Sequence, residues 1–178
     1  MIYSIGYGNR KFTEFVNLLK KFNIEYVVDV RSKPFSMMNQ EFNKDILARL
    51  LSQHEITYSF FGYELGGRPD DETCYTNGKV DYNLLEQKPF YKKGIERLKS
   101  AFDQDFNVAI MCSETKPEEC HRSKLIGDTL FRNDIKVQHI DEFGELTDQV
   151  SVILKANNGK NPRNLFGELE MTSRKKYK

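Results

Sequence analysis

The sequence has no long hydrophobic run, few cysteines and almost no net charge. No stretch of the 178 residues approaches the roughly 20 consecutive apolar residues that a membrane-spanning helix needs. The chain starts on an apolar segment at residues 2–5 instead of a basic and then apolar leader, so we expect a cytoplasmic protein without membrane association. Three cysteines, an odd number, argue against a disulfide framework and favour free thiols or a metal site.

The formal net charge of +1 favours no class of partner by itself. The end of the chain differs, because basic residues outnumber acidic ones after residue 150. Such a tail could contact phosphate backbones, but a solvated, flexible end is the favoured interpretation. The basic residues of this tail are Lys155, Lys160, Arg163, Arg174, Lys175, Lys176 and Lys178.

Hydrophobic content of 39% and charged content of 30% indicate a globular protein, and the length corresponds to one domain. Five short apolar runs have the character of β-strands and alternate with segments of helical periodicity. These runs lie at residues 2–5, 26–30, 56–60, 108–111 and 136–140. The alternation predicts a single three-layer α/β domain, with a mostly parallel five-stranded sheet and helices on both faces.

The sequence contains no internal repeat and no low-complexity tract. We predict an α/β domain at residues 1–145, followed by a C-terminal helix at residues 146–154 and a basic, loosely ordered tail to residue 178. The connection at residues 65–82 is long and rich in turn-forming residues. Connections of this length inside a domain are more often lids or binding loops than spacers.

Four polar segments each follow a predicted strand, at residues 6–10, 29–36, 62–68 and 112–122. In parallel α/β sheets ligands bind outside the carboxyl ends of the strands, so these segments are expected to face one crevice. The last segment combines two thiols, an imidazole, a guanidinium and a carboxylate. These groups belong to Cys112, Glu114, Cys120, His121 and Arg122.

A helix is predicted to start near Lys116. Thr115 and Glu118 have the spacing of a capping box, and Pro117 suits a first helical turn. Cys112 would then lie beneath the positive end of this helix, which would depress the pKa of its thiol. Because helical side chains lean toward the N-terminus, Arg122 would lean back over the loop that carries Cys112.

Taken together, several motifs resemble those of the DUF488 family, small proteins of unknown function. The motifs are D-V-R-S at 29–32 followed by Pro34 and Ser36, L-G-G-R at 65–68, M-C-S-E at 111–114, C-H-R at 120–122 and V-Q-H-I at 137–140. The resemblance covers roughly residues 1–140 and implies a small α/β domain whose loops form the site. The family's first loop usually reads Gly-His-Ser-Asn, whereas Tyr7 and Gly8 replace its histidine and serine here.

The first hypothesis for function is an enzyme with a reactive cysteine that acts on an anionic substrate, such as a nucleotide or nucleic-acid component. Cys112 would be the nucleophile, Glu114 would transfer a proton, and His121 and Arg122 would support them. The predicted substrate-binding residues are Tyr7, Asn9, Arg10, Asp29, Arg31, Ser36, Gly66, Gly67, Arg68 and Cys120.

Two alternatives remain open. No cofactor is evident from a standard motif, yet Cys112, Cys120 and His121 could bind zinc, with Glu114, Cys74, His139 or water as the fourth ligand. Against this, the adjacent Cys120 and His121 would not easily reach one ion from a regular helix. The other alternative is a non-enzymatic nucleotide- or nucleic-acid-binding module that uses loop arginines and neighbouring aromatic residues.

Overall fold

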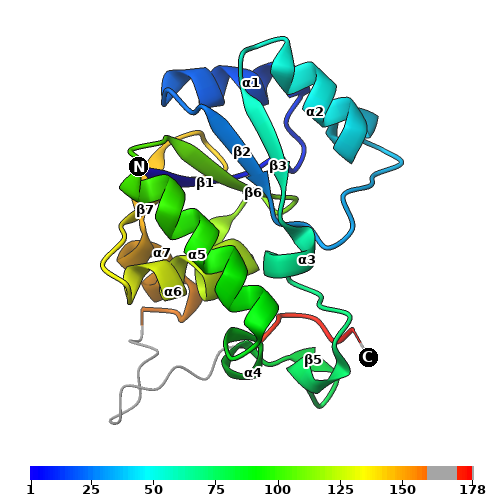
Figure 1. The fold of residues 1–178 in the computed structure, drawn as a ribbon, viewed down its shortest axis with the longest axis vertical. Helices are drawn as coiled ribbons and strands as arrows, with labels where there is room; N and C mark the ends of the chain where they lie inside the picture. The colour runs from blue at the N-terminus through cyan, green and yellow to red at the C-terminus, as the bar shows by residue number, and fades with distance from the viewer. Residues whose placement is uncertain (160–171, 178) are drawn as a thin grey trace.

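The structure is a computed structural model that describes residues 1–159 and 172–177. In this part of the chain a six-stranded sheet has the order β3-β2-β6-β1-β7-β8, and β8 alone runs antiparallel to its neighbour (Figure 1). The predicted α/β fold is confirmed, with one more strand than predicted. The strands of this sheet are β1 (Ile2–Gly6), β2 (Tyr26–Asp29), β3 (Thr57–Phe60), β6 (Val108–Cys112), β7 (Val137–Ile140) and β8 (Leu146–Asp148).

Helices cover both faces of the sheet. On one face lie α1 (Phe12–Lys21) and α2 (Lys44–Ser52), and on the other α5 (Pro89–Asp103), α6 (Asp128–Phe131) and α7 (Gln149–Ala156) (Figure 1). Shorter segments are α3 (Gly62–Leu65), α4 (Tyr82–Glu86), the 3-10 turns η1 (Gln40–Phe42), η2 (Glu72–Cys74) and η3 (Pro117–Glu119), and the π-helix η4 (Arg122–Gly127). None of the helices in the described ranges is long and apolar enough to cross a membrane.

The central strand β6 shows why the sheet needs helices on both sides. All five of its residues are buried, and successive side chains point to opposite faces. Ala109 and Met111 join the core beneath α1 and α2, whereas Ile110 and Cys112 join the core beneath α5. A strand that is apolar on both faces is typical of a parallel sheet between two helical layers.

The segment at residues 65–82, predicted as a long irregular connection, contains regular structure. It includes η2 and a hairpin of β4 (Tyr75–Thr76) and β5 (Lys79–Val80). Asn77 and Gly78 form the turn with positive φ angles of 52° and 79°. An Asn-Gly pair in this conformation is typical of a two-residue hairpin, because both positions must be left-handed.

Residues 172–177, called the C-terminal segment below, pack against this hairpin. Thr172 forms an antiparallel bridge with Asp81, and the amide of Ser173 donates to the carbonyl of Val80 at 2.9 Å. Figure 1 shows the segment beside β5 and α4, far in sequence from its neighbours. Most of the predicted loosely ordered tail, residues 160–171 and 178, lies outside the described residues.

The helix predicted at residues 146–154 begins later, after a short strand. Gly144, with φ of +82°, lets the chain reverse so that β8 pairs with β7. Asp148 then caps α7, its carboxylate accepting a hydrogen bond from the amide of Ser151 at 3.0 Å. Residues 146–148 are therefore strand, and the helical pattern applies from Gln149 onward.

His139, near the end of β7, is fully buried in a hydrogen-bond network that joins β1 to α7. Its Nδ1 is 2.6 Å from Ser4 Oγ, and its Nε2 is 2.6 Å from Gln149 Oε1. An amide oxygen only accepts, so Nε2 carries the proton and Nδ1 accepts from Ser4. Burial, reinforced by the charge of Arg122, lowers the pKa of His139 from 6.5 to about 4. His139 therefore has a structural role.

This shift predicts acid sensitivity. Because the unfolded chain binds the proton more tightly, the contribution of neutral His139 is complete above pH 6.5 and is lost as the pH falls toward 4, at a cost of about 3 kcal/mol. Urea unfolding across this range should show a steeper loss of stability in the wild type than in His139→Gln. His54→Gln, with a histidine outside the network, should keep the wild-type slope; a His139→Gln slope equal to the wild type would contradict the prediction.

Candidate functional site

The carboxyl ends of β1, β2 and β6 meet at one edge of the sheet, because these strands are parallel and in register. Gly6 pairs with Cys112, and Asp29 pairs with Met111. The chain leaves β1 and β2 toward the layer of α1 and α2, but it leaves β6 toward the opposite layer. Such a divergence opens a crevice between neighbouring strand ends, as the sequence analysis expects.

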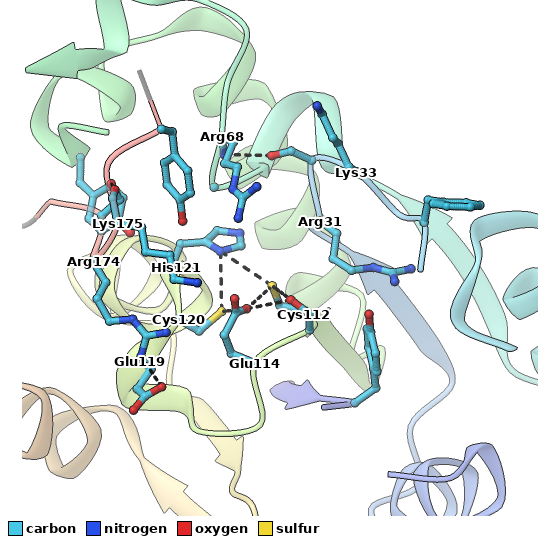
Figure 2. Close-up of a pocket in the computed structure, with 18 residues that line it drawn as sticks. Arg31, Lys33, Arg68, Cys112, Glu114, Glu119, Cys120, His121, Arg174 and Lys175 are labelled. Atoms are coloured by element: carbon cyan, nitrogen blue, oxygen red, sulfur yellow. Dashed lines mark hydrogen bonds and ion pairs between the residues drawn. The ribbon is translucent and has the colours of Figure 1, made fainter. Parts of the chain in front are cut away.

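A cavity of about 190 Å³ lies at this edge. Figure 2 shows Arg31 and Lys33 on one side of it and Arg174 and Lys175 on the opposite side. The thiols, imidazole and carboxylate of the segment after β6 lie between these two sides. The cavity therefore combines a basic lining with a cluster of reactive groups.

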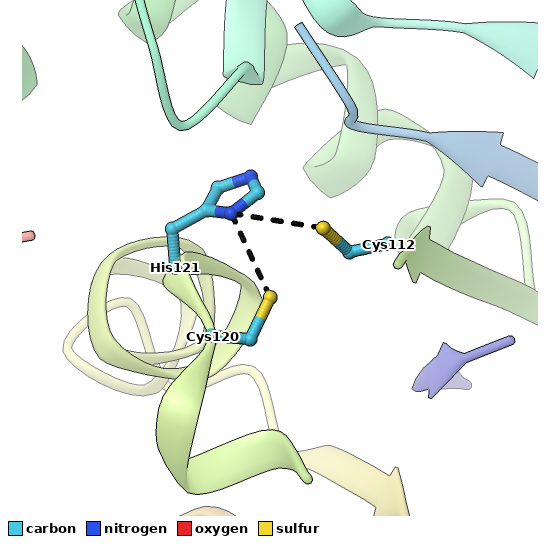
Figure 3. Close-up of side chains that lie close together, drawn as sticks. All are labelled: Cys112, Cys120 and His121. Atoms are coloured by element: carbon cyan, nitrogen blue, oxygen red, sulfur yellow. Dashed lines mark hydrogen bonds between the residues drawn. The ribbon is translucent and has the colours of Figure 1, made fainter. Parts of the chain in front are cut away.

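That cluster, called the Cys-His-Glu cluster below, consists of Cys112, Glu114, Cys120 and His121. His121 Nδ1 lies 3.9 Å from the sulfur of Cys112 and 3.6 Å from the sulfur of Cys120 (Figure 3). Glu114 Oε2 accepts hydrogen bonds from both thiols, at 3.0 Å from Cys112 and 3.5 Å from Cys120. The predicted convergence of these four residues is thus present in the structure.

The local backbone brings Cys120 and His121 to the same place. The continuous helix predicted from Lys116 is wrong: the turn η3 ends at Glu119, Cys120 is extended with φ −114° and ψ 148°, and η4 begins at Arg122. The predicted capping box is also absent, because Glu118 pairs with Lys155 at 2.7 Å instead. The extended residue between two helical turns lets adjacent side chains face one point.

The imidazole of His121 is held on two sides. Its Nε2 lies 3.1 Å from the carbonyl oxygen of Val30. Gly67 packs against the ring so closely that a Cβ at this position would lie 2.8 Å from it. Because a carbonyl only accepts, Nε2 carries a proton and Nδ1 faces the two sulfurs.

The two thiols have opposite shifts in acidity. The hydrogen bond between the thiols, together with burial, raises the pKa of Cys112 well above its usual value. Burial also opposes ionisation of Cys120, but the bond from Cys112 and the charge of Arg122 outweigh it and lower the pKa of Cys120. The predicted depression of the Cys112 pKa is therefore wrong in direction.

The pKa values of the neighbouring carboxyl and imidazole groups are both shifted toward the charged form. Burial opposes ionisation of Glu114, yet hydrogen bonds from Cys112, Ser113 and the backbone hold its pKa at about 2. Burial likewise disfavours the imidazolium of His121, but attraction to Cys112 and Glu114 raises its pKa. The cluster thus places one carboxylate and two sulfur groups around one imidazole.

Arg122 holds the loop after β6 from beneath. Its guanidinium donates to the carbonyl oxygens of Glu114 and Thr115, the latter at 2.9 Å, and to Ser4 Oγ at 3.2 Å. The side chain leans over this loop as predicted, but it is fully buried and does not line the cavity. Its geometry is that of a residue that positions Glu114.

Arg31 forms a buried ion pair with Asp29. Arg31 Nε and Nη2 donate to the two carboxylate oxygens at 2.9 and 2.6 Å, and Nη2 also donates to the carbonyl of Phe42. Asp29 further accepts from Tyr58 Oη at 2.7 Å. Arg31 lines the cavity, and its buried Nη1 has no partner among the described residues.

Three more of the predicted substrate-binding residues line the cavity. They are Tyr7, which stacks on Phe42 with ring centroids 4.2 Å apart, and Gly67 and Arg68. The guanidinium carbon of Arg68 lies 4.1 Å from the ring centroid of Tyr177 in the C-terminal segment. These residues and Arg31 surround the Cys-His-Glu cluster.

The remaining predicted residues do not line the cavity. Asn9 is exposed, and Arg10 donates to the carbonyls of Gly6 and Asp141. Ser36 lies in the loop after β2, where its amide donates to Asn43, and Gly66 packs against Ser32. Asn43 occupies the N-cap position of α2, but its side chain makes this loop contact instead of a cap.

Several cavity residues were missed by the sequence analysis. They are Ser32, Lys33, Glu119, Arg174 and Lys175. The excess of basic residues after residue 150 was the signal available for the last two, yet it could not show where they fold back. Arg174 and Lys175 reach the cavity because the C-terminal segment packs against the hairpin.

The fold and the site define an α/β protein with a mainly parallel sheet, whose carboxyl edge carries a cavity lined by thiol, imidazole and carboxylate groups. The chain belongs to the DUF488 family: residues 11–127 match the family model described as a domain of unknown function, DUF488. The resemblance recognised in the sequence is thereby confirmed. No curated protein and no solved structure matches the chain.

Proposed function

We propose that this protein is an enzyme that acts on an anionic substrate, with a nucleotide or nucleic-acid component as the first candidate. The observation that carries the proposal is the position of the Cys-His-Glu cluster inside a cavity with a basic lining. Cys112, Glu114, Cys120 and His121 are the proposed catalytic residues. Arg122 is a positioning residue for Glu114.

The charge of the lining supports an anionic substrate. Five basic residues, Arg31, Lys33, Arg68, Arg174 and Lys175, line the cavity together with two carboxylates. One of these carboxylates, Glu119, is already paired with Arg174 at 2.5 Å. The cavity therefore has an excess of positive charge, which phosphate groups would neutralise through charge-assisted hydrogen bonds.

Arg31 supplies an unused donor. Its side chain is 5% exposed and its charge is fixed by Asp29, but Nη1 remains without a partner among the described residues. A buried donor without an acceptor costs roughly 1–3 kcal/mol, and a bound anion would remove that cost. Substrate oxygens are therefore expected near the guanidinium of Arg31, which lines the cavity.

Binding of anions is the first prediction from this site. We expect Arg68→Gln to weaken binding of AMP about tenfold, because one charge-assisted hydrogen bond contributes on the order of 1.5 kcal/mol. Isothermal titration calorimetry of AMP and of inorganic phosphate would measure this loss. Arg49→Gln, which removes an exposed arginine of α2 outside the cavity, is the matched control and should bind AMP like the wild type. Equal losses in both variants would indicate a nonspecific charge effect.

A second experiment tests whether the protein converts a bound nucleotide or only binds it. Nucleotides bearing mono-, di- and triphosphates would be incubated with the wild type and with Cys120→Ser and followed by phosphorus NMR. Conversion that disappears in Cys120→Ser would support the enzyme. Tight binding without conversion of any nucleotide would favour the non-enzymatic nucleotide- or nucleic-acid-binding module.

A further inference from the structure

Three side chains of the cluster have the spacing of metal ligands. The sulfurs of Cys112 and Cys120 and a ring nitrogen of His121 all lie within 4.8 Å of one another. Zinc binds sulfur at about 2.3 Å and imidazole nitrogen at about 2.0 Å, so a tetrahedral site separates these atoms by roughly 3.6 Å. The two sulfur to Nδ1 distances are 3.6 and 3.9 Å (Figure 3).

The imidazole of His121 has Nδ1, the nitrogen that could bind a metal, on the side of the two sulfurs. His121 Nε2 donates to the carbonyl of Val30 at 3.1 Å, which leaves the lone pair of Nδ1 directed at the sulfurs. Histidines that bind metals commonly donate their other N–H to a carbonyl or carboxylate, because this bond fixes the tautomer and the ring orientation. Gly67 adds a steric constraint on the same ring.

Adjacent residues of a regular helix would not easily reach one ion, but Cys120 and His121 do not lie in a regular helix. Cys120 is extended and His121 follows in a helical conformation, so their side chains meet at one point. Cys112 reaches that point from the end of β6 (Figure 3). One ligand thus comes from a rigid central strand and two come from the turn that follows.

A fourth coordination position would be available toward the cavity. All three candidate ligands line the cavity, and so does Glu114, whose Oε2 contacts both thiols. Zinc sites with three protein ligands and an open position are typical of catalytic sites, whereas structural sites have four protein ligands. Glu114 has the position of a carboxylate that completes the site or binds a metal-bound water.

We propose that Cys112, Cys120 and His121 bind a zinc ion whose fourth coordination position faces the cavity. Thiolate and imidazole ligands favour zinc over magnesium or calcium, which prefer oxygen ligands. The inference deepens the proposed function, and it rests on that function for the role of the metal alone: zinc there would polarise an oxygen of the anionic substrate or of a bound water. The two cysteines would then act as ligands and not as nucleophiles.

Zinc content tests the proposal. The full chain, kept reduced, is loaded with zinc, dialysed and analysed by mass spectrometry for metal. We expect about one equivalent in the wild type and in Cys74→Ala, which removes the third cysteine outside the cluster. Cys112→Ser and Cys120→Ser should each retain less than about a tenth of an equivalent, since loss of a ligand weakens zinc binding more than about a hundredfold.

Cobalt gives a readout that requires no variant to fold. The wild type titrated with Co²⁺ should develop the intense visible bands of tetrahedral cobalt and a thiolate charge-transfer band, with both saturating at one equivalent. Absence of these bands, or zinc retained equally by the cysteine-to-serine variants, would overturn the proposal.

Failure of the metal site and failure of anion binding are distinguishable. Arg68→Gln should retain zinc like the wild type while binding AMP more weakly, because Arg68 is not a candidate ligand. Wild-type protein that binds AMP but neither zinc nor cobalt would refute the metal site alone. Protein that binds zinc but no AMP would refute the proposed substrate class alone.

Discussion

Replacing Arg122 by methionine is expected to lower the free energy of unfolding by about 4 kcal/mol. Arg122 is fully buried and donates to the carbonyls of Glu114 and Thr115 and to Ser4 Oγ. Methionine fills most of the same volume but donates nothing, and each buried acceptor without a donor costs roughly 1–3 kcal/mol. Urea unfolding at neutral pH measures the loss.

Two further variants sharpen this test. Arg132→Met removes a half-exposed arginine that pairs with Glu86 and Asp128, and it should cost less than about 1 kcal/mol. Arg122→Lys should recover only part of the loss, because an ammonium group does not reproduce the planar fork of donors. An Arg122→Met protein as stable as Arg132→Met would show that the loop after β6 does not depend on this guanidinium.

A second large effect is expected at Asp29. Asp29→Asn should lower the free energy of unfolding by about 3–5 kcal/mol, the usual result of leaving one partner of a buried ion pair uncompensated. The carboxylate is fully buried and accepts from the amide, Nε and Nη2 of Arg31 and from Tyr58 Oη. An amide in its place has one oxygen fewer and turns an NH₂ group toward these donors.

The double variant Asp29→Asn with Arg31→Met distinguishes a broken pair from a simple loss of packing. If the damage comes from the uncompensated guanidinium, the double variant should be more stable than the sum of the two single losses predicts, by more than about 1 kcal/mol. Glu145→Gln, in an exposed pair with Lys21 at 3.3 Å, is the surface control and should change little. Strict additivity would indicate that the two side chains act independently.

Much of the fold was predictable because local patterns agreed with it. Apolar runs such as residues 108–111 are too short for a helix and too uniformly apolar for a half-exposed strand. They also alternate with amphipathic segments. Polar residues after several such runs indicated a site at the carboxyl edge of the sheet, and Cys112, Glu114, Cys120 and His121 do meet there. The sixth strand was not predicted, because β8 has only three residues and therefore no recognisable periodicity.

The errors share a different cause, which is competition between local signals and distant partners. Thr115 and Glu118 have capping-box spacing, but Glu118 pairs with Lys155 of α7, and the loop packs against the turn after β1. Arg122 is kept out of the cavity by acceptors in two segments, Ser4 of β1 and the adjacent carbonyls of Glu114 and Thr115 in the loop after β6. Lys155 and Ser4 are far in sequence from Glu118 and Arg122, the residues that they contact.

Local patterns were enough to predict the class of fold, the family and the edge of the sheet where the reactive groups gather, because hydrophobic periodicity and motif order can be recognised in the chain without its partners. The three-dimensional structure was needed to show which arginines line the cavity, where the C-terminal segment folds back and how Cys120 and His121 turn toward Cys112. Those outcomes depend on hydrogen bonds and packing between residues far apart in the chain, which no local pattern encodes.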